Sequence, residues 1–277
     1  MSKEGNPLPT EILLEDTDGC GSLLLLLTCS LLMTSSQSKA NVDERKGDEG
    51  AARYSCTFPG MIQQWRSAFQ QPSAYFGFVQ LSTWCGNGEL IAEMRTLGQM
   101  AALRLPKVGY ATNADHGAGC NIHPPPKQYC ATRLANSALA LEYGKAVPWK
   151  SPSFLSQTTS GSPPSVTVQL NDVGAAGLRD DQYPFNYLDG AFDCKQNAGK
   201  CAWAELQLTD GSWVNATITL AVGGAGLTLT APGAPAQSAP GAPVASRYGW
   251  GAVPMLSVYD KQTGLPVLPW WSNHSLQ

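Results

Sequence analysis

The hydrophobic pattern of this 277-residue chain changes once, near Val147. Before that point, apolar residues recur at the spacing of helix faces, and two short apolar runs of strand length separate the helical segments. After it, apolar and polar residues alternate in short segments between Gly, Asp and Asn turns. This order predicts an α/β region followed by an all-β region, and it excludes a single helical bundle.

The first region, residues 51–148, is predicted to run helix, strand, helix, strand, helix. The segments are "FPGMIQQWRSAF" (58–69), "AYFGFVQLS" (74–82), "ELIAEMRTLGQMAALRL" (89–105), "VGYATNAD" (108–115) and a helix between Pro126 and Gly144. Alternating helices and strands are typical of a parallel sheet. In the last helix Leu134, Ala138 and Leu141 share a face, which we expect in the core. Arg95 and Gln99 are expected on a solvated face of the middle helix.

The second region, residues 149–277, is predicted to be an all-β, sandwich-like domain. Its strand segments are "SVTVQL" (165–170), "WAELQL" (203–208), "ATITLAV" (216–222) and "LTLTA" (227–231). Residues 231–243 contain "APGAP" twice, a composition that cannot bury a core. We therefore expect a flexible insertion there.

Residues 1–50 form a leader that is either an atypical signal or a disordered segment. The run "SLLLLLTCSLLM" (22–33) has the length of a signal-peptide core, but acidic residues dominate the segment before it. It is too short to cross a bilayer, so no transmembrane span is expected. The charged run at 41–50 is predicted to be a solvated linker or loop.

Composition narrows the possible partners. The chain has 18 basic and 21 acidic residues, net charge −3, and no basic stripe with interleaved aromatics, so a nucleic-acid partner is not expected. Eight cysteines lack paired CxxC spacing, and we expect no metal or other cofactor. Cys194 and Cys201 flank a short loop suited to a disulfide, and Asn215 and Asn273 begin glycosylation sequons. Together these features favour an oxidising compartment.

The stretch from Ala114 to Gly144 holds two of the three histidines. His123 lies in an Ile-His-Pro turn just before a helix, and a histidine is the side chain whose ordinary pKa best suits a general base at neutral pH. His116 is expected in a surface loop, and His274 lies in the tail.

Several of these segments, in order, resemble the carboxy-terminal part of the sialate O-acetylesterases, serine esterases of the SGNH hydrolase superfamily. Residues 115–124, "DHGAGCNIHP", match without a gap the family's usual Asp-Leu-Gly-Asp-x-x-Asp-Ile-His-Pro block. "YSCTFPGMIQQWRSAF" and "FGFVQLS" precede it, while "GAFDCK", "DGSWVNATI", "SRYGW" and "TGLPVLPWWS" are similar to the family's β domain. The likeness spans about Asn41 to Trp271. It implies a partial SGNH-type three-layer sheet, with only the later strands and helices, before the β domain.

The resemblance implies hydrolysis of O-acetyl esters of sialic acids or related sugars by a secreted or lysosomal protein without a cofactor. The partner would be an O-acetylated sugar or a sialoglycan. His123 matches the family's catalytic histidine, and Asp115 matches the first Asp of the block. Asn121 stands where the family usually has the carboxylate that orients the histidine. An amide can bond the ring but stabilises its positive charge less well.

The family's nucleophile motif, Ser-Gly-Gln-Ser-Asn-Met, is not intact, and neither is its Gln-Gly-Glu-Ser-Asn motif, whose last Asn corresponds to Asn41. "SSQSKA" (35–40) resembles the first motif, with Ser38 in place of the serine. The catalytic site is therefore expected to be incomplete. One alternative is a non-catalytic glycan-binding β module, with Trp213 or Trp250 contacting sugar. Another is half a parallel sheet that cannot fold alone.

Overall fold

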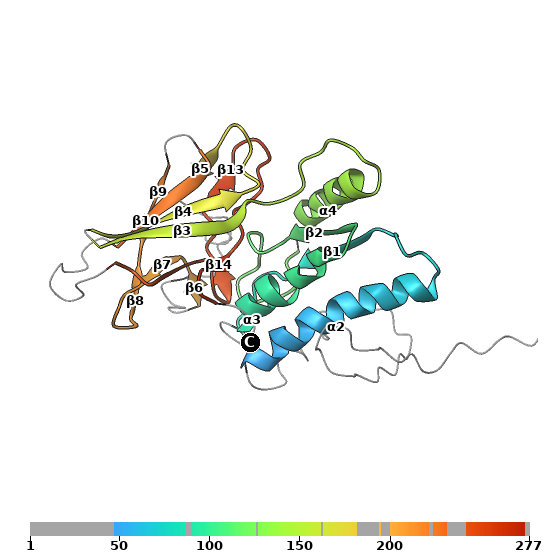
Figure 1. Cartoon of the computed structure of the whole chain (residues 1–277), viewed down its shortest axis with the longest axis horizontal. Coiled ribbons are helices and arrows are strands. Elements are labelled where there is room, and N and C mark those ends of the chain that lie inside the picture. Colours follow the sequence, from blue (N-terminus) through green and yellow to red (C-terminus); the bar gives the residue numbers. More distant parts are fainter. Residues whose placement is uncertain are drawn as a thin grey trace, which may run out of the picture.

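A computed structural model describes residues 47–86, 90–125, 127–161, 163–181, 194, 200–221, 224–231 and 242–274 (Figure 1). Ser38 and most of the 231–243 insertion lie outside these residues. The elements in chain order are helix α2 (Gly47–Ala68), strand β1 (Phe76–Gln80), helix α3 (Leu90–Glu93), a π-helical turn (Met94–Gly98), a 3-10 turn (Met100–Arg104), strand β2 (Val108–Thr112), helix α4 (Gln128–Leu141), and strands β3 (Ser153–Gly161), β4 (Pro164–Asn171), β5 (Leu178–Asp180), β6 (Cys201–Ala202), β7 (Ala204–Gln207), β8 (Trp213–Asn215), β9 (Thr217–Leu220), β10 (Gly226–Thr230), β11 (Ala245–Tyr248), β12 (Val253–Pro254), β13 (Val258–Asp260) and β14 (Trp270–Trp271). The mixed helix and strand architecture predicted from the pattern is confirmed.

β1 and β2 pair in parallel, as the pattern predicted, with Phe76 opposite Val108. Because alternate residues of a strand point to opposite faces, Phe78 and Tyr110 lie on one side of this pair, where they pack near Phe58 of α2. Figure 1 shows the two strands lying between α2 and α4.

α4 packs closely against the other face of the pair because β2 has a glycine there. A Cβ on Gly109 would lie 2.8 Å from Oγ of Ser137. The residues of α4 that are fully buried are Arg133 and Ser137, whereas Leu134 is only half-buried. The predicted face of Leu134, Ala138 and Leu141 is half-buried, and Leu141 packs on Gly109 beside Ser137, but the most buried residues lie one position before Leu134 and one before Ala138.

Two predictions about the helices before β2 were wrong. α2 begins at Gly47 and carries Pro59 in its interior, so residues 47–50 are helical rather than a linker and the helix starts before the predicted segment 58–69. The middle helix is a short α-helix followed by π-helical and 3-10 turns. Arg95 and Gln99 are buried in it and do not lie on a solvated face.

The described residues from Ser153 onward form two four-stranded sheets, in the orders β3-β4-β10-β9 and β14-β11-β7-β8, and two strand pairs, β12-β6 and β13-β5. The two four-stranded sheets share one hydrophobic core. Its fully buried side chains include Val168 of β4, Leu229 of β10 and Leu206 of β7. Tyr248 of β11 stacks on Trp270 of β14 in the same core. Alternation of apolar residues along β4 places every second side chain inward, as the sequence indicates.

Arg95 joins the two parts of the chain. Its guanidinium donates to the carbonyl oxygens of Leu81 at 2.7 Å, Ser82 at 2.7 Å and Gly251 at 3.2 Å. Burial lowers the pKa of Arg95 to about 9, so the group still carries its charge at neutral pH. Three backbone carbonyls therefore hold this buried cation and fix the residues that follow β1 against the β region.

Candidate active site

The loop between β2 and α4 carries all three candidate residues, and it has two parts. We call residues 113–117 the loop base and residues 118–125 the loop tip. Every residue of the loop base is buried, whereas Asn121 and His123 in the loop tip are exposed. The loop leaves the carboxyl end of a parallel strand, which is where open α/β sheets bind ligands.

Asp115 in the loop base is paired with Arg133 of α4. The two guanidinium Nη atoms donate to Oδ1 at 2.7 Å and Oδ2 at 2.8 Å, and Nη1 also donates to the Thr112 carbonyl at 2.9 Å. Burial alone would lower the pKa of Arg133, but the charge and hydrogen bonds of Asp115 raise it above its ordinary value. This bidentate pair fixes the end of β2 to α4.

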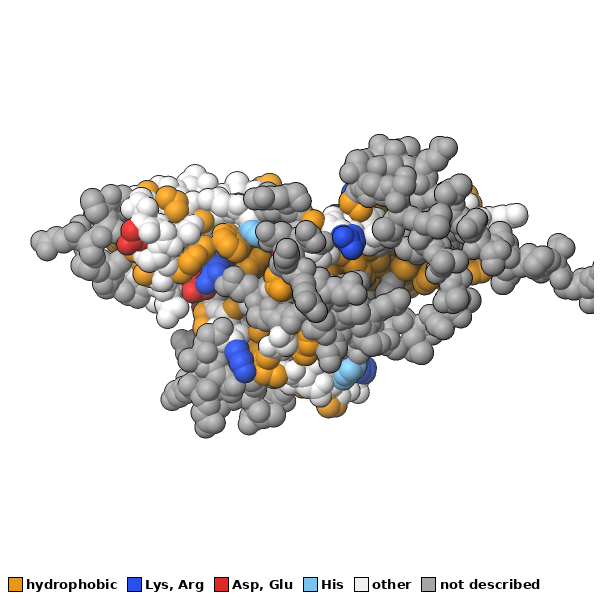
Figure 2. Space-filling model, turned by 90° about the horizontal axis from the view of Figure 1, so that it is seen from below, with side chains coloured by type: hydrophobic (Ala, Val, Ile, Leu, Met, Phe, Trp, Pro, Cys, Tyr) orange, Lys and Arg blue, Asp and Glu red, His pale blue; other side chains and the backbone are white. Residues whose placement is uncertain are grey.

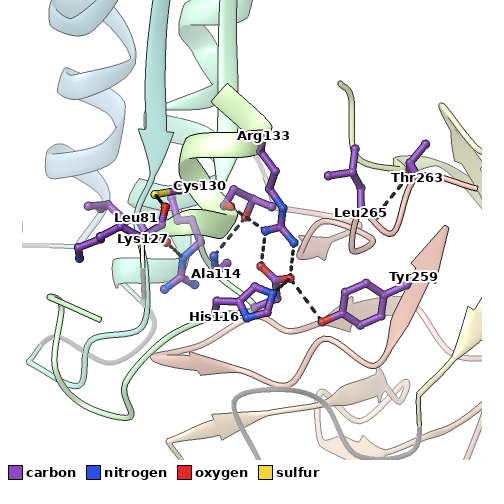
Figure 3. A network of polar contacts seen from close by, with 12 residues as sticks. Leu81, Ala114, His116, Lys127, Cys130, Arg133, Tyr259, Thr263 and Leu265 are labelled. Carbon is purple, nitrogen blue, oxygen red and sulfur yellow. Dashed lines mark hydrogen bonds and ion pairs between the residues drawn. The ribbon is translucent and has the colours of Figure 1, made fainter. Parts of the chain in front are cut away.

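Two further rings surround the same carboxylate. The hydroxyl of Tyr259 in β13 donates to Oδ2 of Asp115 at 3.4 Å, and Nε2 of His116 lies 3.3 Å from that oxygen. Figure 3 shows Arg133 and Tyr259 approaching this point from different elements, with His116 beside them. Burial, and secondarily the Asp115 charge, raises the pKa of Tyr259, which keeps its hydroxyl protonated as a donor.

His116 is buried rather than in a surface loop, so that prediction was wrong. Its ring stacks on Tyr129 with centroids 3.5 Å apart. Burial lowers the pKa of His116, the Asp115 charge opposes this effect, and the Arg133 charge adds to it. His116 therefore packs between the Tyr129 ring and the Asp115–Arg133 pair, which is a structural role. The sequence did not indicate this role because Tyr129 and Arg133 belong to the next helix.

The loop tip presents His123 to solvent. The backbone N–H of His123 donates to Oδ1 of Asn121 at 3.0 Å. The backbone N–H of Asn121 in turn donates to the Ala118 carbonyl at 3.0 Å, and Gly119 between them adopts φ 58°. Glycine suits this left-handed turn because it lacks a Cβ. The Asn121 side chain thus supports the backbone at His123, while the proposed roles of Asn121 and Asp115 toward the His123 ring stay predictions.

Polar side chains that sequence reasoning missed lie at the carboxyl ends of both parallel strands. Ser82 and Thr83 follow β1, Asn113 follows β2, and all three are buried. Within the part of the chain that the structure describes, their side-chain oxygens have no hydrogen-bond partner. Their places directly after strand ends are the signal that could have identified them.

The structure also places the cysteines, Trp250 and His274 that the sequence analysis considered. Cys194 and Cys201 form the predicted disulfide, and Cys85 pairs with Cys120. Trp250 is buried, which removes it as a sugar-contacting residue. His274 lies 2.7 Å from Oε1 of Glu93, which ties the tail to α3.

The described residues contain neither a metal-binding cluster nor a helix suited to a membrane. No group of three or more His, Cys, Asp or Glu side chains with metal-binding geometry lies among these residues. None of their helices has both the length and the apolar character needed to cross a membrane. On the face seen in Figure 2, the coloured Lys and Arg side chains are few and separated.

Comparison with solved structures finds a carbohydrate acetylesterase from Xanthomonas citri with a similar fold. The two are 25% identical with a TM-score of 0.66, and the match covers 86% of this chain and 49% of the Xanthomonas chain. This chain therefore spans about half the length of that enzyme. No family model and no curated protein matches the sequence. The similarity in fold to a carbohydrate acetylesterase thus comes from the structural comparison and not from a family model or a curated sequence.

Proposed function

We propose that this chain is a carbohydrate-esterase-type protein that acts on O-acetyl esters of sugars, with His123 as the general base. The observation that carries the proposal is the position of His123. It is exposed on the loop that leaves the second of two parallel strands, in a fold similar to that of a carbohydrate acetylesterase. Sialic acids are the sugars that the sialate O-acetylesterase resemblance favours, and the "NIHP" block within residues 115–124 is its main support.

The chemistry assigned to His123 is proton transfer. An imidazole nitrogen removes a proton from the attacking oxygen as that oxygen bonds to the acetyl carbonyl carbon, and the imidazolium then protonates the departing sugar oxygen. The products are acetate and the free sugar hydroxyl. Without an intact nucleophile motif, we assign the attacking oxygen to water. Direct hydrolysis assisted by a base is weaker than catalysis through an acyl-enzyme.

Ester turnover by the purified chain tests this proposal. The assay compares acetate release from an O-acetylated sialic acid and from a simple aryl acetate, for the parent chain and for His123→Ala, Ser38→Ala and His116→Ala. We expect slow hydrolysis that His123→Ala reduces to the buffer rate and that Ser38→Ala leaves intact. Loss of activity in Ser38→Ala would instead make that serine the nucleophile. A parent rate equal to buffer, or full activity in folded His123→Ala, would overturn the proposal.

We also propose a secreted or lysosomal location. The Cys85–Cys120 and Cys194–Cys201 disulfides support it, since such bonds persist in oxidising compartments. Asn215, which begins one sequon, is exposed at the end of β8 and could accept a glycan. Expression in a secretory host, followed by glycosidase digestion and mass measurement, tests this location.

A further inference from the structure

Cys85 and Cys120 connect the two loops at the carboxyl ends of the parallel strands. Cys85 follows β1 and Cys120 lies in the loop tip, and the disulfide between them brings their Cα atoms to 4.7 Å. The same two loops also touch at Gly117, where a Cβ would lie 2.1 Å from Oγ1 of Thr83. The loop tip is thus joined to the residues that follow β1 (81–86) by a covalent bond, and the Thr83 side chain lies close against the Gly117 backbone nearby.

The loop tip alternates between anchored and exposed residues. Cys120 and Ile122 pack against a small hydrophobic cluster whose buried members include Ile91, Val253 and Met255. Asn121 and His123, the intervening residues, are exposed. The half-buried residues Cys120 and Ile122 thus lie on either side of Asn121 and directly before His123, so the exposed histidine follows an anchored residue.

The loop tip also has local backbone restraints. The turn at Gly119 and the bond from the His123 N–H to Asn121 fix the backbone over a few residues only. An exposed segment without such tethers is mobile, and its orientation carries a large entropic cost. The disulfide links the tip to the residues that follow β1, and Ile122 links it to the cluster that includes Val253 of β12; Pro124, directly after His123, is buried as well.

We propose that the Cys85–Cys120 disulfide, together with Ile122, positions the His123 ring, so that these residues act on catalysis through His123 without touching substrate. The inference rests on the proposed function for its catalytic meaning. The geometric part concerns the order of the His123 ring and can be tested without turnover.

The test compares Cys85→Ala/Cys120→Ala with Cys194→Ala/Cys201→Ala in the full chain. The second pair removes the Cys194–Cys201 disulfide, which packs against the same hydrophobic cluster, and it is the matched control for loss of a disulfide from that cluster without loss of the tether at Cys120. Imidazole NMR signals report on each ring, and with only three histidines in the chain His123→Ala assigns the signal of interest. We expect the His123 signals to sharpen and move to the positions of an unfolded peptide only in the first variant. The His116 and His274 signals should stay in place, which shows that the protein remains folded.

A second variant covers the case in which the first does not fold. Ile122→Ala keeps the disulfide and removes the other anchor, and we expect a smaller change of the His123 signals in the same direction. In the esterase assay, we expect kcat to fall roughly tenfold or more in the disulfide variant, with KM changed less than about twofold, because misplacement of a base lowers the rate of the chemical step.

The outcomes separate the two proposals. Unchanged His123 signals in folded Cys85→Ala/Cys120→Ala and in Ile122→Ala would overturn the positioning role. The same would follow if the control pair altered His123 equally. If no form of the chain hydrolyses acetyl esters, the proposed function fails, while the NMR comparison still decides whether the disulfide orders the ring.

Discussion

The loop base and the loop tip are held in different ways although they are neighbours in one loop. In the loop base, Asp115 is completely buried and is fixed by charge, through the bidentate bond from Arg133. In the loop tip, His123 is exposed and its segment is fixed by the Cys85–Cys120 disulfide and by Ile122. One part is made rigid by buried electrostatics and the other by a covalent tether.

The difference follows from what each part can tolerate. A buried carboxylate loses its hydration, so it needs a close cation and further hydrogen bonds. In its proposed role as general base, His123 would have to reach the proton that it removes, so its ring would have to stay accessible. A disulfide restrains the backbone near such a residue without covering its side chain. The two parts should therefore respond differently to substitution.

The largest effect is expected from Arg133→Met. The variant leaves the buried Asp115 carboxylate without its two charge-assisted hydrogen bonds, and breaking a buried pair in this way costs about 3–5 kcal/mol. Urea denaturation measures the change in the free energy of unfolding. The control is Lys107→Met, because the Lys107–Glu142 pair is about 40% exposed on both sides and should contribute less than about 1 kcal/mol.

Asp115→Asn combined with Arg133→Met completes this comparison. Since the double variant removes the buried charge as well as its partner, it should recover part of the lost stability. Equal destabilisation by Arg133→Met and Lys107→Met would mean that charge does not hold the loop base.

A comparable effect, no larger than that of Arg133→Met, is expected when the tether of the loop tip is removed. The Cys85–Cys120 disulfide spans 35 residues and Cys194–Cys201 spans 7. In the chain-entropy account a longer closed loop gives more stabilisation, so replacing both cysteines by alanine should cost about 4 kcal/mol in the first case and about 2 kcal/mol in the second. Thermal unfolding of both variants checks the order. A larger cost for the short loop would contradict it.

The sequence predicted the strands of this fold better than it predicted the buried polar side chains. The apolar runs that became β1, β2, β4, β7 and β10 are recognisable because their periodicity is local. Arg95 and His116 were placed on the surface because a charged or polar residue is exposed by default. Their actual partners, Gly251 and Tyr129, lie on other elements, and no local pattern indicates them.

In the candidate site, too, the residue within a local sequence block was predicted and the residue that depends on packing between elements was not. The block at 115–124 identified His123 as a residue of interest, and the structure leaves it exposed at a strand end. The function of Arg133 as the partner of Asp115 was not predicted, because the pairing depends on how α4 packs on Gly109. The start of α2 was missed since "GDEG" has no apolar periodicity.

The smallest effect is expected from the titration of His116, and it tests the loop base alone. Because burial lowers the pKa of His116, the unfolded chain takes up a proton near pH 6.5 that the folded chain resists. The unfolded state then binds more protons, so the free energy of unfolding should fall as the pH drops below about 6.5. The Asp115 charge opposes the burial effect and keeps this loss small.

We expect His116→Phe, which retains a ring against Tyr129, to show a weaker decline in the free energy of unfolding than the parent between pH 7 and pH 5. Tyr129→Ala, which uncovers His116, should give an intermediate slope. Urea denaturation across this pH range measures all three, and a decline as steep in His116→Phe as in the parent would assign the acid sensitivity to groups other than His116.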